Sequence, residues 1–341
     1  MLAVLKEHPA PGVSVKEVPE PKPKEGEVLV KVKYASICGT DIGIYDWIPW
    51  AAAHIKPPTI IGHELVGEVL EVNAGQGSPS TSSGSIRPGD LVSSETHIFC
   101  GNCLTCKEGN LHVCENMKLF GIGRDGSFAE YATIPLKTTW KNDRRIPLEV
   151  MSIQEPFGNA VHAVTKAGVQ GKRVLVVGLG PTGLCAGAVA RFQGAHEIVG
   201  MNNSAYRRGL AEKTGWFDRV SSTSDFEDRD AYDVVLEMSG SRLGIQTAFD
   251  AVRPAGTIVA FGIPKDEISV DWGKYLINKE ITILSVFGRK IWETWHTTNE
   301  MLVSGKLDFH NMITHRFPLK DFEEAMRVMK SGECGKVLLV P

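Results

Sequence analysis

The first 150 residues consist of short apolar runs separated by glycine and proline. Such runs occur at residues 26–35, 65–72, 89–95 and 128–134. Short runs of this composition, bounded by turn-forming residues, are typical of β-strands. Residues 75–89 are small, polar and without a pattern, which predicts a surface loop. The pattern therefore predicts a β-rich domain over residues 1–150.

Beyond residue 150 the pattern changes to strands that alternate with helices. Apolar, β-branched runs occur at residues 173–178, 198–201, 233–240, 256–262 and 280–288. Strands buried on both faces have this composition, and their alternation with helices predicts a parallel, doubly wound sheet. We assign this α/β domain to residues 151–288. The remaining segment, 289–341, has helical patterns at 292–304 and 321–330 and ends in an apolar strand, which we expect to return to the first domain.

Composition and charge narrow the range of functions. Of the 341 residues, 43% are hydrophobic and 23% are charged, as in ordinary globular proteins. The net charge of −3 provides no basic field, so we expect neither nucleic acid nor a membrane surface as partner. No apolar stretch approaches the roughly 18 residues of a membrane helix, and the first residues become charged too early for a secretory signal. The expected partner is a small molecule.

Four cysteines lie close together, at Cys100, Cys103, Cys106 and Cys114. Four thiolates in one loop can close a tetrahedron around zinc, and a site without an open position is structural. The CxxCxxC spacing also fits an iron–sulfur loop, but the last cysteine follows after seven residues instead of three. A disulfide pair is the third alternative. Because nothing marks the chain for export, we expect reduced cysteines in the cytoplasm and predict structural zinc.

A second set of candidate ligands lies upstream. Cys38 lies in the sequence CGTD, and His63 and Glu64 lie in GHE. A thiolate, an imidazole and a carboxylate that leave one position open are typical of catalytic zinc. Cysteine and histidine are also common core residues, but Gly39 and Gly62 let the backbone bend close to these ligands. We therefore predict two zinc ions per chain.

Three glycines, Gly178, Gly180 and Gly183, form the sequence GxGxxG directly after the first strand of the α/β domain. A helical stretch follows, from about Pro181 to Gln193. Such a turn places a pyrophosphate against the helix N-terminus. A tight turn without a ligand is the alternative, but the position between a buried strand and a helix favours a dinucleotide site.

Nearly from end to end, the chain resembles the zinc-dependent medium-chain dehydrogenases, in particular the branch of threonine, polyol and sugar dehydrogenases. The motifs that carry the resemblance are CGTD at 38–41, IYDWIPWA at 44–51, GHE at 62–64, ETHIFCGNC at 95–103, QEPFGNAVH at 154–162 and GRKIWETW at 288–295. The resemblance implies a GroES-like, β-rich catalytic domain followed by a Rossmann domain. It also implies hydride transfer between a small polar secondary alcohol and NAD(P). The candidate substrates are L-threonine and, alternatively, a polyol, sugar or sugar acid. A zinc-free or non-enzymatic relative is disfavoured because Cys38 and His63 are both present.

The resemblance also implies roles at the catalytic zinc. Glu64 and Glu155 are ligands or near-ligands, and Thr40 begins a proton relay from the substrate. The threonine enzymes carry a histidine three residues after that threonine, where this chain has Gly43. Glycine cannot accept a proton, so water and the cofactor ribose, His54 or His97 must complete the relay. Of the two histidines we favour His97, which matches a family histidine near the substrate pocket.

Cofactor-binding positions and assembly follow from the same resemblance. Besides the three glycines, the implied positions are Thr182, Asn202, Arg207, Phe261, Gly262, Ile263, Val286 and Phe287. An acid normally ends the second strand, where it binds the ribose hydroxyls and repels a 2′-phosphate. Here Asn202 occupies that position, with Arg207 and Arg208 close behind, so NAD and NADP both remain open. A homotetramer is implied, in which strand 281–287 pairs across a two-fold axis.

Overall fold

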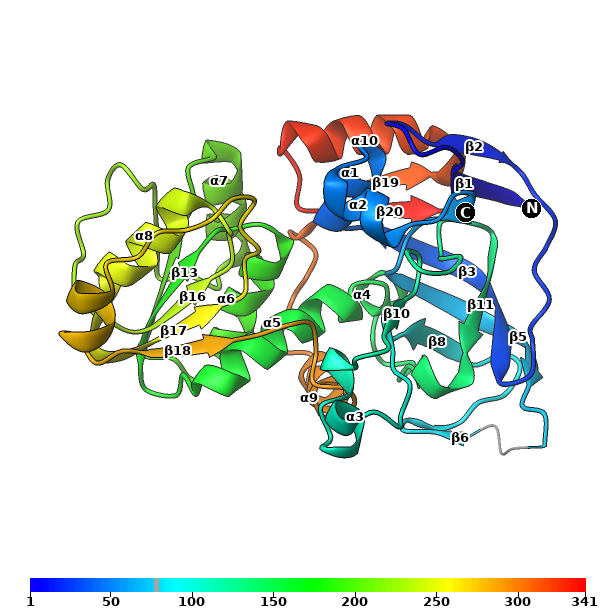
Figure 1. Cartoon of the computed structure of the whole chain (residues 1–341), viewed down its shortest axis with the longest axis horizontal. Helices are drawn as coiled ribbons and strands as arrows, with labels where there is room; N and C mark the ends of the chain where they lie inside the picture. The colour runs from blue at the N-terminus through cyan, green and yellow to red at the C-terminus, as the bar shows by residue number, and fades with distance from the viewer. Residues whose placement is uncertain (77–79) are drawn as a thin grey trace. The chain divides into compact units, whose positions relative to one another are not determined.

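Two units make up the chain in the computed structural model, which describes residues 1–76 and 80–341 (Figure 1). Unit 1 contains Met1–Glu155, Lys290–Trp292 and Ile313–Pro341, and unit 2 contains Pro156–Arg289 and Glu293–Met312. The segment assigned above to 289–341 is thus divided. Its helix α9 (Glu293–Val303) belongs to unit 2, and its end belongs to unit 1.

A large sheet forms the centre of unit 1. Its order is β12 (Thr139–Lys141), β8 (Leu91–Ser94), β5 (Leu65–Asn73), β3 (Glu27–Ile37), β20 (Lys336–Val340) and β19 (Ile313–Pro318), with β11 (Tyr131–Pro135) also paired to β3. Only the pair of β19 and β20 is parallel among the described strands of this sheet. Because β20 lies between β3 and β19, the last strand completes a sheet that the first part of the chain begins.

Smaller elements surround this sheet. They are β1 (Leu2–Lys6), β2 (Ser14–Glu17), β4 (Thr59–Ile60), β9 (His97–Ile98), β10 (Lys118–Leu119), α1 (Gly39–Tyr45), α2 (Pro49–His54), α3 (Leu104–Lys107), α4 (Leu148–Met151) and α10 (Phe322–Ser331). The segment 75–89, predicted as a loop, contains a short hairpin of β6 (Ser80–Thr81) and β7 (Gly84–Ser85), and residues 77–79 lie outside the described part. The loop prediction was too simple there, because two-residue strands leave no hydrophobic pattern.

Helix α10 shows how the sequence places the core of unit 1. Phe322, Ala325, Met326 and Met329 are buried and recur every three or four residues, so they form one apolar stripe. They pack into the same hydrophobic cluster as the inward-facing residues of β3 and β5. The ring of Phe322 lies 5.5 Å from that of Phe128, centre to centre.

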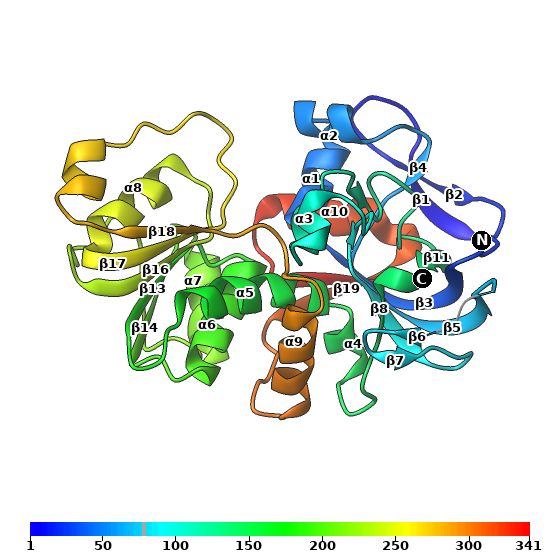
Figure 2. The same cartoon turned by 60° about the horizontal axis from the view of Figure 1, so that its bottom comes forward.

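Unit 2 contains a six-stranded parallel sheet. Its order is β15 (Arg219–Ser221), β14 (Glu197–Met201), β13 (Arg173–Val177), β16 (Tyr232–Glu237), β17 (Val252–Ala260) and β18 (Thr282–Ser285). Figure 2 shows α6 (Pro181–Phe192) and α7 (Ala205–Thr214) on one face and α8 (Arg242–Ala251) on the other. The doubly wound parallel sheet is therefore confirmed. The order reverses between β13 and β16, and ligands of such sheets bind at the carboxyl ends of the strands beside this switch point.

Within the described residues, no helix combines the length and the apolar character needed to cross a membrane.

Candidate functional site

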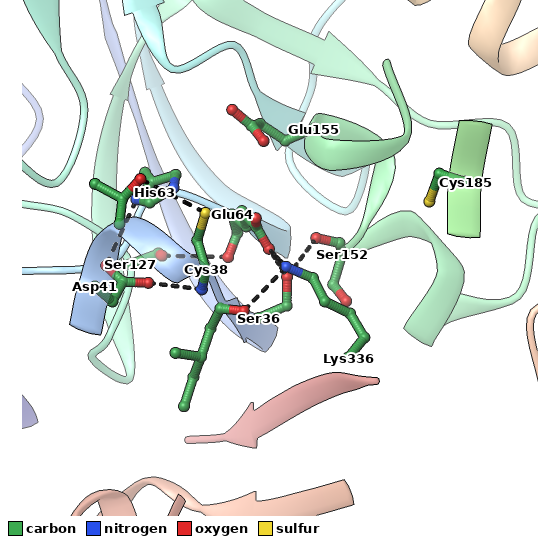
Figure 3. Close-up of polar contacts among 12 residues, drawn as sticks. Ser36, Cys38, Asp41, His63, Glu64, Ser127, Ser152, Glu155, Cys185 and Lys336 are labelled. Carbon is green, nitrogen blue, oxygen red and sulfur yellow. Dashed lines mark hydrogen bonds and ion pairs between the residues drawn. The ribbon is translucent and has the colours of Figure 1, made fainter. Parts of the chain in front are cut away.

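Cys38 lies where β3 ends and α1 begins, and Asp41 fixes it there. The backbone N–H of Cys38 donates to Oδ2 of Asp41 at 2.8 Å. Oδ1 of the same carboxylate lies 3.6 Å from Nδ1 of His63. Asp41 is fully buried, so one carboxylate holds the backbone of the thiol and faces the imidazole ring (Figure 3). Groups behind metal ligands orient them in this way.

A glycine turn presents His63 and Glu64. Gly62 has a φ of +95°, and a Cβ at this position would overlap the ring of Phe128. Only glycine combines this backbone conformation with so close an approach. The turn leads into β5 and leaves both His63 and Glu64 buried.

Side-chain ligand atoms of Cys38, His63 and Glu64 all lie within 4.8 Å of one another. Zinc bonds of about 2.0–2.3 Å put two ligand atoms of one ion at most about 4.6 Å apart, so this spread needs only a small contraction. Buried polar atoms are nearly always paired, yet Oε1 of Glu64 has no hydrogen-bond partner among the described residues. This set of donors fits a zinc ion.

The charges around His63 lead to the same conclusion. Burial alone would lower the pKa of His63, but the nearby Asp41, Cys38 and Glu155 raise it to about 10. Burial also raises the pKa of Asp41 to about 6. The cluster has a surplus of acidic groups that favours a positive charge in its centre, and a metal cation supplies one without a proton on the imidazole.

Glu64 is anchored at its other oxygen. Oε2 accepts a hydrogen bond from Oγ of Ser36 and forms a close ion pair with Nζ of Lys336 (Figure 3). Nζ of Lys336 also donates to the carbonyl oxygen of Ile37 at 3.0 Å. Lys336 is only 1% exposed, so this cation is enclosed together with the carboxylate.

The predicted catalytic residues Thr40, Glu155 and His97 lie in the same unit as these ligands. The hydroxyl of Thr40 is 3.8 Å from Sγ of Cys38. Glu155 accepts a hydrogen bond from Thr96 at 3.0 Å. Oε1 of the buried Glu95 binds both the backbone N–H and Nδ1 of His97, at 2.9 and 2.7 Å.

Two further positions bear on the proton relay. A Cβ placed on Gly43 would lie 2.9 Å from Cδ1 of Ile48, so the space beside this glycine is taken by an isoleucine side chain. His54 is exposed on α2, where its ring stacks on Trp50 and its Nδ1 contacts the carbonyl oxygen of Trp50 at 2.7 Å. His97 therefore remains the favoured histidine.

The cysteine loop brings its four ligands together. The Sγ atoms of Cys100, Cys103, Cys106 and Cys114 lie within 4.8 Å of one another, and all four are free thiols. Backbone N–H groups point at the sulfurs. Those of Cys100 and Asn116 lie 3.2 and 3.3 Å from Sγ of Cys114. A contact from Thr105 and backbone N–H groups lower the pKa of Cys103 to about 6. Donors that stabilise thiolates fit a closed zinc site.

The three glycines of the turn in unit 2 differ in what a side chain at each position would meet. Gly178 has a φ of +98°, and a Cβ there would lie 2.8 Å from Cβ of Ser239. A Cβ on Gly183 would overlap the carbonyl oxygen of Gly178, so this glycine lets α6 approach β13. By contrast, a Cβ on Gly180 would meet only Nη1 of Arg207, at 3.7 Å. Nothing in this unit requires a glycine at 180, which fits a turn kept open for a pyrophosphate.

Arg207 and Arg208 differ in their contacts. Nη1 of Arg208 donates to the carbonyl oxygens of Asn202 and Asn203, both at 2.8 Å. The buried Nε of Arg207 has no hydrogen-bond partner in the described structure. The side chain of Asn202 accepts the backbone N–H of Ser204 at 2.8 Å, which leaves its amide group as donor.

The remaining predicted cofactor positions follow strand ends of the same sheet, except Thr182, which lies in the first turn of α6. Phe261, Gly262 and Ile263 follow β17, and Val286 and Phe287 follow β18. Ile263 is 81% exposed, and apolar side chains left uncovered at the carboxyl edge fit a ligand that covers them. Buried Glu237 accepts the N–H groups of Ser239 and Gly240, and so holds the loop after β16.

Sequence reasoning did not assign roles to Asp41, Glu95, Ser36 and Lys336. Asp41 and Glu95 belong to motifs already singled out, and an acid two or three residues from a predicted ligand was a usable signal. Lys336 offered none, because a lysine at the start of an apolar strand usually faces water.

Comparisons with known proteins agree with this arrangement. Residues 24–144 match the alcohol dehydrogenase GroES-like domain, and residues 181–304 match the zinc-binding dehydrogenase domain. The chain is 43% identical to the L-threonine 3-dehydrogenase of Pyrococcus abyssi, over all of this chain and 98% of that protein. A zinc-binding dehydrogenase from Sinorhizobium meliloti bound to NADP has a TM-score of 0.89 and 26% identity, covering 100% and 99% of the two chains. Galactitol-1-phosphate dehydrogenase from Escherichia coli has a TM-score of 0.89 and 25% identity over all of both chains.

Proposed function

The chain belongs to the zinc-dependent medium-chain dehydrogenases, and within that family we propose that it oxidises the secondary hydroxyl of L-threonine. The observation that carries the proposal is the ligand set of Cys38, His63 and Glu64 in a chain similar along its whole length to L-threonine 3-dehydrogenases. Hydride transfer between an alcohol and NAD(P) is the chemistry of the family. The choice of alcohol is the proposal.

Gly43 is the strongest argument against threonine, and its surroundings weaken that argument. A missing histidine would enlarge the pocket and favour a bulkier sugar acid only if its space stayed open. The side chain of Ile48 reaches within 2.9 Å of a Cβ at position 43 and takes up that space. The space nearest Gly43 is therefore partly filled in this chain, which agrees with a small substrate.

In the proposed reaction, Cys38 and His63 would hold a zinc ion, which would supply Lewis-acid chemistry to the substrate hydroxyl. Asp41 and His63 are buried, and Asp41 fixes the backbone of Cys38, so that little reorganisation would accompany the reaction. The turn at Gly178–Gly183 would hold the dinucleotide, which would supply the hydride acceptor.

Proton release needs a route that does not use position 43. The hydroxyl of Thr40, 3.8 Å from Cys38, is the first acceptor in this proposal. His97 is the second, because Glu95 binds its Nδ1 at 2.7 Å and so directs proton exchange to Nε2. A buried acid that orients a histidine and stabilises its charged form is a recurrent arrangement in general base catalysis.

For the cofactor, we propose that the site accepts both NADP and NAD. Asn202 brings no negative charge against a 2′-phosphate, and its amide group can still donate to a ribose hydroxyl. Arg207 supplies a guanidinium beside the glycine turn, with a buried Nε that lacks a partner among the described residues. The S. meliloti relative bound to NADP supports this reading.

We also propose a homotetramer in the cytoplasm. β18 is an edge strand of its sheet, and Ile283 on it is 42% exposed, so pairing with a second copy would cover an open edge. None of the seven cysteines, all of which the structure describes, forms a disulfide, as expected in a reducing compartment.

The second candidate is a polyol or sugar acid, since galactitol-1-phosphate dehydrogenase shares the fold over its whole length. The deciding experiment measures initial rates with L-threonine, L-allo-threonine, galactitol and a sugar acid, each with NAD and NADP. We expect the highest kcat/KM with L-threonine. A higher value for galactitol or the sugar acid would reject threonine and select the second candidate.

A further inference from the structure

Lys336 is an unusual residue to find at a metal site. It begins β20, far along the chain from Cys38 and Glu64, and it is 1% exposed. A buried lysine needs partners for its charge. Its Nζ has two, Oε2 of Glu64 and the carbonyl oxygen of Ile37, the residue directly before Cys38.

The two carboxylate oxygens of Glu64 differ in their contacts. Oε2 accepts a hydrogen bond from Oγ of Ser36 and forms an ion pair with Nζ of Lys336. Oε1 is buried without a hydrogen-bond partner in the described part of the chain. One carboxylate oxygen of Glu64 lies within 4.8 Å of Sγ of Cys38 and of a ring nitrogen of His63. The carboxylate is thus anchored from the side of β3 and β20 while remaining in reach of the metal position (Figure 3).

We propose that Lys336 is a positioning residue that controls whether Glu64 binds the zinc. A buried carboxylate must neutralise its charge, and a dication in reach would otherwise bind it permanently. The ammonium group of Lys336 satisfies that charge without occupying the metal, so a coordination position stays available to the substrate alcohol. This inference rests on the proposed function, because it requires zinc at Cys38 and His63.

A purely structural role is the competing explanation. Lys336 contacts the carbonyl of Ile37 and could simply fill the junction of β20 with β3. The two roles differ in their dependence on Glu64. A positioning role disappears when the carboxylate is removed, whereas a structural role does not.

The test measures the rate at which zinc is lost to excess EDTA. The protein is compared with Lys336→Met, Lys336→Arg, Glu64→Gln and the double variant Lys336→Met/Glu64→Gln. Cys38→Ser identifies which kinetic phase belongs to this site and which to the cysteine loop. Lys336→Gln is measured beside Lys336→Met. The glutamine keeps a hydrogen-bond donor for the carbonyl of Ile37 and removes only the charge, so it serves as the test if Lys336→Met does not fold.

We expect zinc release from the Cys38 site to slow in Lys336→Met and Lys336→Gln, because Glu64 then adds a ligand to the metal. The expected size is about tenfold, the lower end of the changes that groups behind metal ligands cause. Lys336→Arg should retain the original rate, and the double variant should release zinc as Glu64→Gln does. The d–d spectrum of the cobalt-substituted protein should change in Lys336→Met, because a further ligand alters the coordination number, and should return in the double variant.

Release that is unchanged in Lys336→Met and Lys336→Gln, or accelerated equally with and without Glu64, would overturn the positioning role. The zinc content of the unaltered protein distinguishes a failure of the positioning role from a failure of the proposed function. If no zinc depends on Cys38, the proposed function fails and the inference fails with it. If that zinc is present and Lys336 has no effect on it, only the inference fails.

Discussion

Replacing Arg207 with alanine should weaken cofactor binding, whereas the same change at Arg208 should mainly reduce stability. Arg207 lies beside Gly180 with a buried Nε that has no partner among the described residues, so a phosphate is the expected acceptor. A hydrogen bond to a charged group contributes about 1.5–3 kcal/mol, which corresponds to roughly 10- to 150-fold in Kd. Arg208 instead donates to the carbonyls of Asn202 and Asn203. Two neutral acceptors at 2.8 Å suggest a loss of about 1–2 kcal/mol in unfolding free energy.

Fluorescence titration with NADH and NADPH, together with urea unfolding, measures both effects on the same preparations. Arg207→Ala should raise both dissociation constants, and more for NADPH if the guanidinium contacts the 2′-phosphate. Arg208→Ala is the matched control, since it removes the same charge from the neighbouring position of α7. Equal changes in Kd for the two variants would show that only the general positive field matters. An unchanged Kd in Arg207→Ala would refute the reasoning from its contacts.

Four further predictions concern the metals, the glycine turn, the relay and Asn202. Metal analysis should give two zinc ions per chain. Cys38→Ser should lose one ion and all activity, whereas Cys103→Ser should lower the unfolding temperature. One zinc or fewer in active protein would contradict the two sites. Gly183→Ala should cost about 3 kcal/mol in unfolding free energy because its Cβ overlaps Gly178, while Gly180→Ala should leave stability nearly unchanged and weaken cofactor binding. Gly43→His with Ile48→Ala should raise the rate of alcohol oxidation near neutral pH, more than Gly43→His alone, since Ile48 occupies the space; no rise in the double variant would mean that proton release is not limiting. Asn202→Asp should favour NAD over NADP in kcat/KM, and a preference of the original enzyme for NAD above about a thousandfold would contradict the role given to Asn202.

The sequence was sufficient for the fold, and it also pointed to the glycine turn and the cysteine loop, because the signals of these features are local. Gly178, Gly180 and Gly183 follow a buried strand directly, and Cys100–Cys114 is a single short loop. The surroundings of the ligands were not predictable in the same way. Glu64 meets Lys336 only because β20 pairs with β3, and no spacing in the chain relates the two residues.

The surroundings of Gly43 are a second feature that the sequence did not predict. From the sequence, Gly43 indicated that water and the cofactor ribose or another histidine must complete the relay. The sequence did not show that Cδ1 of Ile48, five residues further along, would lie 2.9 Å from a Cβ at position 43. Short-range packing of this kind depends on the direction of a side chain, which residue types alone do not specify.

The position of β20 bears on the order in which the protein matures during synthesis. All four cysteines of the loop are present once residue 114 has left the ribosome, so the proposed zinc ligands are available while most of the 341 residues are still to be made. Cys38, His63 and Glu64 are translated even earlier, but the cation that neutralises Glu64 arrives with the last strand. Until then, the nascent site has a carboxylate without its counter-ion and β3 lacks its neighbour β20. The proposed site at Cys38 therefore gains its buried counter-ion only after β20 has been made, whereas the four cysteines of the loop are all present much earlier.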